Sequence, residues 1–123
     1  MDNDKLTGEI IGAAMKVHSA VGPGFLESAY EASLKFELVK RGLTVESQVP
    51  LQVVYESVTL DVGYRLDLAV EKCVIVELKA IEKVMPIHEA HLISYLKLSG
   101  IKTGLLINFH ELHLRDGIMR RKC

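Results

Sequence analysis

Two charged residues, Glu77 and Lys79, follow directly on an apolar segment that we expect to be a buried strand. Residues 74–76 are all apolar, which is typical of a central strand covered on both faces. Because side chains alternate along a strand, Glu77 and Lys79 point to one face and Leu78 to the other. A charge beside a dry core is costly unless it is paired or binds a metal ion, so this pattern indicates a chemical role.

A third charge, Asp67, lies on the preceding segment and can reach the same place. We expect the two strands to be antiparallel, with Asp67 opposite Glu77. Ala69 then faces Ile75, and the turn over 71–73 has an odd length or contains a bulge. A two-residue turn would direct Asp67 to the opposite face. In the expected register, one face of the hairpin is apolar (Tyr64, Leu66, Leu68, Val70, Val74, Val76, Leu78) and the other carries the charges (Arg65, Asp67, Ala69, Cys73, Ile75, Glu77, Lys79).

Two carboxylates and an ammonium group at one strand end suit a hard divalent cation. Mg²⁺ prefers oxygen ligands and commonly takes one or two carboxylates together with water and a substrate phosphate. Such an ion lowers the pKa of bound water, and a neighbouring lysine can stabilise charge that grows on a phosphodiester. The alternative is a structural ion-pair network, and the spacing of Asp67, Glu77 and Lys79 alone favours neither interpretation.

The composition is that of a globular protein. The 123 residues are enough for one domain with a core of its own, so we expect a single domain over 1–123. The apolar runs are too short to span a bilayer, no signal peptide is visible, and two cysteines make no disulfide framework. We therefore expect a cytoplasmic protein without membrane contact. The net charge of −1 argues against a large nonspecific grip on nucleic acid but leaves room for a small basic cleft.

The order of the expected elements predicts a mixed α/β fold, with a central sheet flanked by α-helices. The first helix is capped by Asn3 or Asp4 and ends near residue 20, and Pro50 confines its strand to a sheet edge or a bulge. Further helices are expected over 25–41 and 87–99, strands over 43–54, 58–62, 64–70, 74–79 and 103–108, and a last hairpin that turns at Asp116-Gly117. The helix over 87–99 can cross over, which allows the strands before and after it to be parallel neighbours.

Polar residues lie on the expected inward faces of these helices. Glu27 continues the spacing of Tyr30, Leu34 and Leu38, although a first-turn carboxylate that complements the helix dipole explains it equally well. His18 lies on the flank of the first helix, where we expect packing or capping. The expected inward stripe of the helix over 87–99 is Ile87, Ala90, His91, Ser94, Tyr95 and Leu98.

The combination of these motifs resembles known families. Asp67 followed by Glu77-Leu78-Lys79 resembles the D…(D/E)xK signature of the PD-(D/E)XK nuclease superfamily, and residues 24–30 are similar to the motif that names the GxxExxY protein family. Further matches to that family lie at 22–24, 63–68, 74–80, 88–90, 95–97, 105–109 and 116–118, so the resemblance covers nearly the whole chain.

The resemblance implies a restriction-endonuclease-like core, which is a mixed sheet with a helix on either side. It implies that Asp67 and Glu77 are metal ligands, that the Leu78 carbonyl completes the metal site, and that Lys79 is the catalytic lysine. Glu27 would be the helix-borne acid that reaches the metal directly or through water. The implied cofactor is Mg²⁺, with Mn²⁺ as an alternative.

Three further residues are candidate contacts to the site or the substrate. His91 stands where similar sequences usually carry glutamine, so it is either another polar contact or a pH-sensitive group near the metal. Tyr30 is interpreted as packing or as orienting Glu27. Lys97 is a candidate phosphate contact, as are Lys83, Arg120, Arg121 and Lys122.

The leading hypothesis is a Mg²⁺-dependent PD-(D/E)XK phosphodiesterase acting on nucleic acid, with DNA ahead of RNA. The alternative is a nuclease fold with weak or no catalysis that serves as a nucleic-acid-binding or assembly module, for which the small size favours a homodimer or a partner protein. A glycoside hydrolase with two carboxylates is a third class, but Lys79 beside Glu77 and the absence of tryptophan for stacking sugars count against it.

Overall fold

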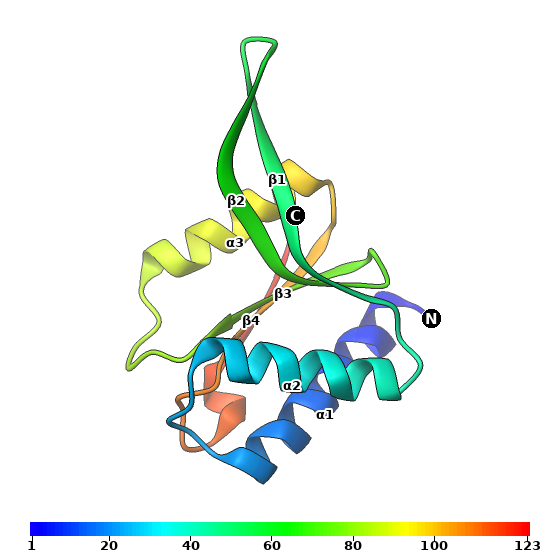
Figure 1. Ribbon diagram of the computed structural model, residues 1–123, viewed down its shortest axis with the longest axis vertical. Coiled ribbons are helices and arrows are strands. Elements are labelled where there is room, and N and C mark those ends of the chain that lie inside the picture. Colours follow the sequence, from blue (N-terminus) through cyan, green and yellow to red (C-terminus); the bar gives the residue numbers. More distant parts are fainter.

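The computed structural model describes residues 1–123 and contains a five-stranded mixed sheet with helices on both of its faces (Figure 1). The helices are α1 (Asn3–Val21), α2 (Glu27–Lys40) and α3 (Pro86–Ser99), with a short 3-10 helix η1 (Leu114–Gly117). The strands are β1 (Val45–Tyr55), β2 (Val58–Val70), β3 (Val74–Lys79), β4 (Thr103–Asn108) and β5 (Ile118–Lys122). They are ordered β1-β2-β3-β4-β5, with β3 and β4 parallel and the other neighbours antiparallel. The predicted α/β arrangement and the parallel pair are confirmed.

Two apolar clusters hold the helices to opposite faces of the sheet. Helices α1 and α2 cover one face through Leu6, Ile10, Leu34 and Leu38, among others, and α3 covers the other through Leu92 and Leu96. Strand β4 admits α3 closely because it carries Gly104, where an added Cβ would lie 2.8 Å from the Leu92 side chain. No helix of the protein is both long and apolar enough to cross a membrane.

The register of β2 against β3 is the predicted one. Ala69 pairs with Ile75, and the two strands are joined by a three-residue turn over 71–73. Glu71 and Lys72 in this turn have positive φ angles of 53° and 54°. Counted away from the turn, the last regular pair of β2 and β3 is Leu68 with Val76, and Asp67 and Glu77 are the next residues. The two predicted partners Asp67 and Glu77 therefore lie at the point where the strands separate.

Beyond that point, β1 and β2 continue as a two-stranded arm, residues 53–64, which projects away from the sheet and helices (Figure 1). The arm turns at Glu56 and Ser57, both with positive φ, between the strands predicted over 43–54 and 58–62. Strand β1 is an edge strand, so the edge position expected from Pro50 is confirmed; the register shift lies beyond Pro50, between Leu51 and Val53.

The sequence analysis placed Leu66 and Leu68 on the same face of the hairpin, and this prediction is wrong for Leu66, which lies just after the arm in β2. Leu66 packs in the cluster under α3, whereas Leu68 packs under α1 and α2. The pairing of β1 with β2 is interrupted between Ser47 and Val49, where Gln48 has a φ of 53°. Strand β2 also separates from β3 at this place. The regular alternation of faces seen over Leu68 to Val70 therefore does not continue from Asp67 back to Leu66.

Three other details differ from the sequence predictions. The side chain that caps α1 is Asp2, which accepts a hydrogen bond from the Lys5 N–H at 2.8 Å. Helix α3 buries Leu92 and Leu96, not the predicted stripe, because it is apolar on several sides and Gly104 decides which side approaches the sheet. The expected last hairpin is absent: Asp116 and Gly117 belong to η1, and β5 pairs with β4.

Candidate active site

The carboxylates of Asp67 and Glu77 lie together where β2 and β3 separate. The backbone N–H of Asp67 donates a hydrogen bond to Glu77 Oε2 at 2.8 Å, and the backbone N–H of Leu78 donates to Asp67 Oδ2 at 2.9 Å. Each carboxylate thus accepts from a backbone donor at the end of the regular strand pairing. These bonds use one oxygen of each carboxylate and hold both groups in a fixed position.

The surroundings raise the pKa values of both carboxylates. Glu77 is only 6% exposed and forms no ion pair. Burial, followed by the negative charge of Asp67, raises the pKa of Glu77 to about 8. Burial also raises the pKa of Asp67, while the hydrogen bond from Leu78 and the charge of Lys79 act in the opposite direction. At neutral pH the pair therefore resists carrying two full negative charges.

Lys79, the last residue of β3, is half-buried and its charge favours ionisation of both Asp67 and Glu77. Its backbone is fixed by β4, because Lys79 pairs with Asn108 and its carbonyl accepts from the Phe109 N–H at 2.8 Å. The fully buried Asn108 side chain also bonds the Ile81 N–H and carbonyl, at 3.1 and 2.8 Å. Asn108, which sequence reasoning missed, thereby fixes the chain just after the lysine.

The helix-borne acid whose charge acts on Glu77 is Glu31 and not Glu27. Glu27 is exposed, so its predicted inward direction is wrong, whereas Glu31 one turn later is half-buried. Burial raises the pKa of Glu31, and Glu31 in turn raises the pKa of Glu77. Gln48 donates to Glu31 Oε1 at 2.8 Å and also favours the charged form of Asp67. The helical spacing i, i+4 from Glu27 was the signal that could have found Glu31.

The other predicted contacts fall into two places. His91 and Lys97 are exposed on α3 and line a hollow together with Tyr64 and Tyr95. Tyr30 is only 1% exposed and packs, as one of its two interpretations expected: its ring stacks on Phe109 and its hydroxyl donates to the Gly22 carbonyl. The loop before α2 is thereby fastened to the core.

Two arginines and one histidine are engaged elsewhere. Arg120 pairs with Asp4, and Arg121 with Glu89, so both guanidinium groups already have carboxylate partners. His18 is buried, and its Nε2 donates to the Glu111 carbonyl at 2.7 Å, which confirms its expected packing role.

The donor set fits a hard cation that brings further ligands of its own. No three histidine, cysteine or acidic side chains are grouped so that they alone could hold a metal ion. Mg²⁺ does not need such a cage, since it commonly binds one or two carboxylates and fills its other positions with water and phosphate. Asp67 and Glu77 offer such a carboxylate pair, and a cation would relieve the repulsion that raises the pKa of Glu77.

The comparison with known families decides the classification. Residues 4–121 match the sequence model of the PD-(D/E)XK nuclease superfamily. The chain belongs to this superfamily. No curated protein and no solved structure matches it. The restriction-endonuclease-like α/β fold predicted from the sequence is confirmed by the five-stranded mixed sheet flanked by three helices. Membership of the PD-(D/E)XK superfamily points to nuclease or phosphodiesterase activity, to nucleic acid as the substrate, and to divalent ions as the typical cofactor.

Proposed function

We propose that residues 1–123 form a single nuclease domain of the GxxExxY type that hydrolyses phosphodiester bonds in nucleic acid, with DNA ahead of RNA. The observation that carries the proposal is the pair of backbone hydrogen bonds, from Asp67 N–H to Glu77 and from Leu78 N–H to Asp67, which holds a buried and a half-buried carboxylate together although their charges repel. A purely structural pair of this kind would gain from a salt bridge, and Glu77 has none. We expect a cytoplasmic location, as the cysteine usage predicts.

Asp67 and Glu77 would hold the ion, with the Leu78 carbonyl as a third protein ligand. Mg²⁺, or Mn²⁺ as an alternative, would lower the pKa of a bound water and neutralise charge on the phosphate. The two carboxylates must be ionised to serve as ligands, so ion binding and proton release from Glu77 are coupled. The backbone bonds to Asp67 and Glu77 fix the direction in which their remaining oxygens point.

Lys79 and the helix α2 complete the proposed site. The Lys79 ammonium already acts on both carboxylates and would stabilise negative charge on the phosphate as it grows in the transition state. We assign to Glu31 the supporting role that the resemblance gave to Glu27, because Glu31 is half-buried and influences Glu77. Glu27, exposed at the start of α2, stays the alternative for this role.

Substitution of Asp67 tests the proposal. Asp67→Ala should abolish metal-dependent cleavage of linear, circular and single-stranded substrates while the circular dichroism spectrum stays native. Asp61→Ala is the matched control, since Asp61 is an exposed aspartate on the same strand and should be dispensable. Cleavage by Asp67→Ala at the wild-type rate would overturn the assignment.

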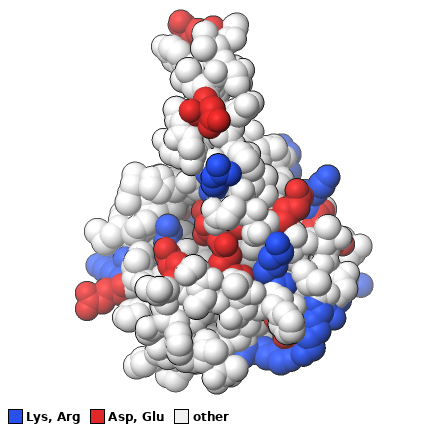
Figure 2. All heavy atoms as spheres, viewed as in Figure 1, with Lys and Arg blue, Asp and Glu red and all other residues white.

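The second candidate function is an assembly module with weak or no catalysis, and the arm favours it. Val54, Tyr55 and Val58 are 64%, 66% and 56% exposed near the arm tip. The charged residues of the arm are Glu56 and Asp61, both acidic, which suits a protein partner or a second copy better than a phosphate backbone. Figure 2 shows the arm as a mainly uncharged projection with acidic atoms along it. Oligomerisation that depends on the arm, without metal-dependent cleavage, would favour this function.

A further inference from the structure

One hollow of the protein has no role in the proposed hydrolysis. It has a volume of about 350 Å³ and lies between the foot of the arm and α3. The arm contributes Val53 and Tyr64, and α3 contributes His91, Ser94, Tyr95, Lys97 and Leu98. Its only charged lining residue is Lys97, which distinguishes it from the acidic pair of Asp67 and Glu77.

Three aromatic rings shape this hollow. The ring centroids of Tyr64 and Tyr95 are 6.2 Å apart with an interplanar angle of 54°, and those of His91 and Tyr95 are 6.4 Å apart at 20°. Tyr64 is 47% exposed, so much of its side chain has no protein partner. A flat aromatic surface that is open to solvent and surrounded by other rings is the arrangement on which planar ligands stack.

Tyr95 connects the hollow with the proposed catalytic pair. Burial raises the pKa of the Tyr95 phenol, and the negative charges of Glu77 and Asp67 add to the effect. Tyr95 therefore lies within electrostatic reach of both carboxylates while it also lines the hollow. Tyr64 also precedes Asp67 by three residues on β2, so a group stacked on Tyr64 would lie within a few residues along the strand of the proposed metal site.

We propose that this hollow receives an unpaired nucleobase, stacked on Tyr64, and that the protein acts on single-stranded nucleic acid. The inference rests on the proposed function and adds the substrate class to it. Every base has a π-face, whereas both faces of a base inside a duplex are already stacked on neighbouring bases. Lys97 supplies a cation for the phosphate backbone, and His91 and Ser94 offer polar groups to the edge of the base.

The test measures binding with cleavage prevented. A fluorescein-labelled oligonucleotide, either single-stranded or annealed to its complement, is titrated with protein in EDTA and followed by anisotropy. Tyr64→Ala should weaken single-strand binding on the order of tenfold or more and leave duplex binding unchanged. Tyr64→Phe keeps the ring and should bind like the wild type. Tyr55→Ala removes a tyrosine at the arm tip that is more exposed than Tyr64 (66% against 47%) and lies outside the hollow, and it should have no effect.

Two further measurements keep the outcomes distinct. An oligonucleotide that contains 2-aminopurine should lose fluorescence on binding the wild type and Tyr64→Phe, because stacking quenches it, but not on binding Tyr64→Ala. Thermal unfolding verifies that all variants are folded. Three results would each overturn the proposal. Tyr64→Ala and Tyr55→Ala could bind the single strand with equal affinity, or Tyr64→Ala could weaken single-strand and duplex binding equally. The third is a wild type that binds no single strand.

The cleavage assay on Asp67→Ala separates this proposal from the proposed function. If Asp67→Ala cleaves normally while Tyr64 governs single-strand binding, the catalytic assignment fails and the base-binding hollow stands. If Asp67→Ala is inactive and Tyr64→Ala binds single strands as the wild type does, the hollow fails and the nuclease assignment stands.

Discussion

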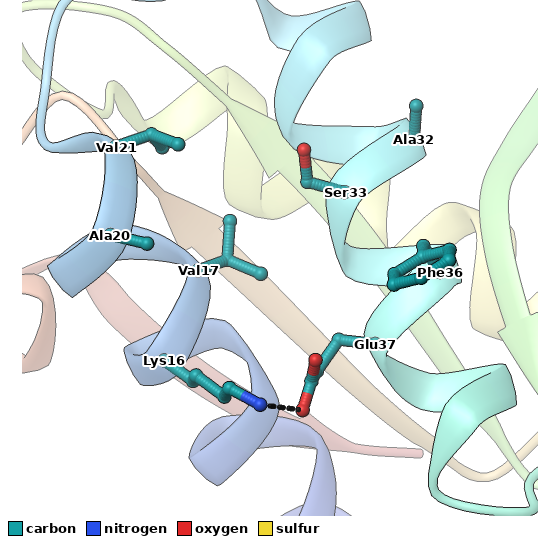
Figure 3. Close-up of a pocket in the computed structure, with 8 residues that line it drawn as sticks. All are labelled: Lys16, Val17, Ala20, Val21, Ala32, Ser33, Phe36 and Glu37. Carbon is teal, nitrogen blue, oxygen red and sulfur yellow. Dashed lines mark hydrogen bonds and ion pairs between the residues drawn. The ribbon is translucent and has the colours of Figure 1, made fainter.

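Two glutamates of this protein are almost equally buried, but their surroundings shift their pKa values in opposite directions. Glu37 in α2 is 7% exposed, and Glu77 in β3 is 6% exposed. A Glu37 carboxylate oxygen lies 3.1 Å from Lys16 Nζ (Figure 3) and 3.3 Å from Arg41 Nε. The hydrogen bond from Lys16 is the main cause that lowers the pKa of Glu37. Glu77 has no ion pair, and burial raises its pKa to about 8.

The difference separates a structural carboxylate from one that is suited to bind a cation. The charge of Glu37 is balanced by Lys16 of α1, by Lys40 of α2 and by Arg41, which directly follows α2, so the protein itself supplies partners for it. The charge of Glu77 is not balanced, and a second carboxylate is held against it. The hollow beside Glu37, about 410 Å³, is larger than the hollow at Tyr64 and Tyr95, about 350 Å³, but it is mostly apolar and carries no second acid (Figure 3). Volume alone does not identify the chemical site.

The largest expected effect is on catalysis. Glu77→Gln should reduce metal-dependent cleavage on the order of 10³-fold, because it removes a charged ligand that the metal needs. Glu37→Gln should leave cleavage unchanged and lower the thermal unfolding temperature, because it weakens contacts with Lys16 and Arg41. Initial rates with Mg²⁺ and melting curves measure both. Equal rates in the two variants would remove the distinction between the two glutamates.

Lys79→Ala should have the next largest effect. It should slow turnover about 10²-fold while divalent-ion affinity is retained, because the ammonium stabilises the transition state and is not a ligand. Lys72→Ala, in the exposed turn of the same hairpin, is the matched control and should have normal turnover. Loss of ion binding in Lys79→Ala would mean that the lysine supports the site structurally.

The two glutamates should also give opposite pH dependences of stability. Between the ordinary pKa of 4.5 and the folded-state pKa of about 8, folded Glu77 holds a proton that the unfolded chain releases. The free energy of unfolding of the metal-free protein should therefore fall as pH rises through this window, and Glu77→Gln should flatten that fall. The lowered pKa of Glu37 acts below 4.5, where stability is lost as pH falls. Urea unfolding in EDTA across pH measures both slopes, and an unchanged slope in Glu77→Gln would contradict the assigned cause.

The smallest expected effect distinguishes two acids of α2. Glu31→Gln removes a charge that raises the pKa of Glu77, and it should change the apparent divalent-ion affinity by a factor of about 3 to 10 at neutral pH. Glu27→Gln, which is exposed one turn earlier, should change the affinity by less than Glu31→Gln. Ion titrations of both variants under the same conditions provide the comparison. A larger effect from Glu27 would restore the role that the sequence assigned to it.

Strand periodicity and turn length were sufficient to predict the centre of the fold. The odd-length turn fixed Ala69 opposite Ile75, and this register brings Asp67 to Glu77. The edge position of the strand with Pro50 also followed from one residue, because proline lacks the backbone donor.

The predictions failed where tertiary contacts decide between similar local patterns. Leu66 changes face because β2 leaves β3 and the β1–β2 pairing is interrupted at Gln48, which no local pattern shows. On α2, Glu27 and Glu31 share one helical face, and their depth depends on how the helix lies over the sheet. On α3, Gly104 of a distant strand selected the buried side.

The most direct test of the unbalanced carboxylate pair is calorimetric titration with Mn²⁺ at about pH 8. We expect the wild type, Glu37→Gln and Lys79→Ala to bind Mn²⁺. We expect Asp67→Ala and Glu77→Gln to lose this binding. Binding that survives in Glu77→Gln with wild-type affinity, or that is lost equally in Glu37→Gln, would contradict this account.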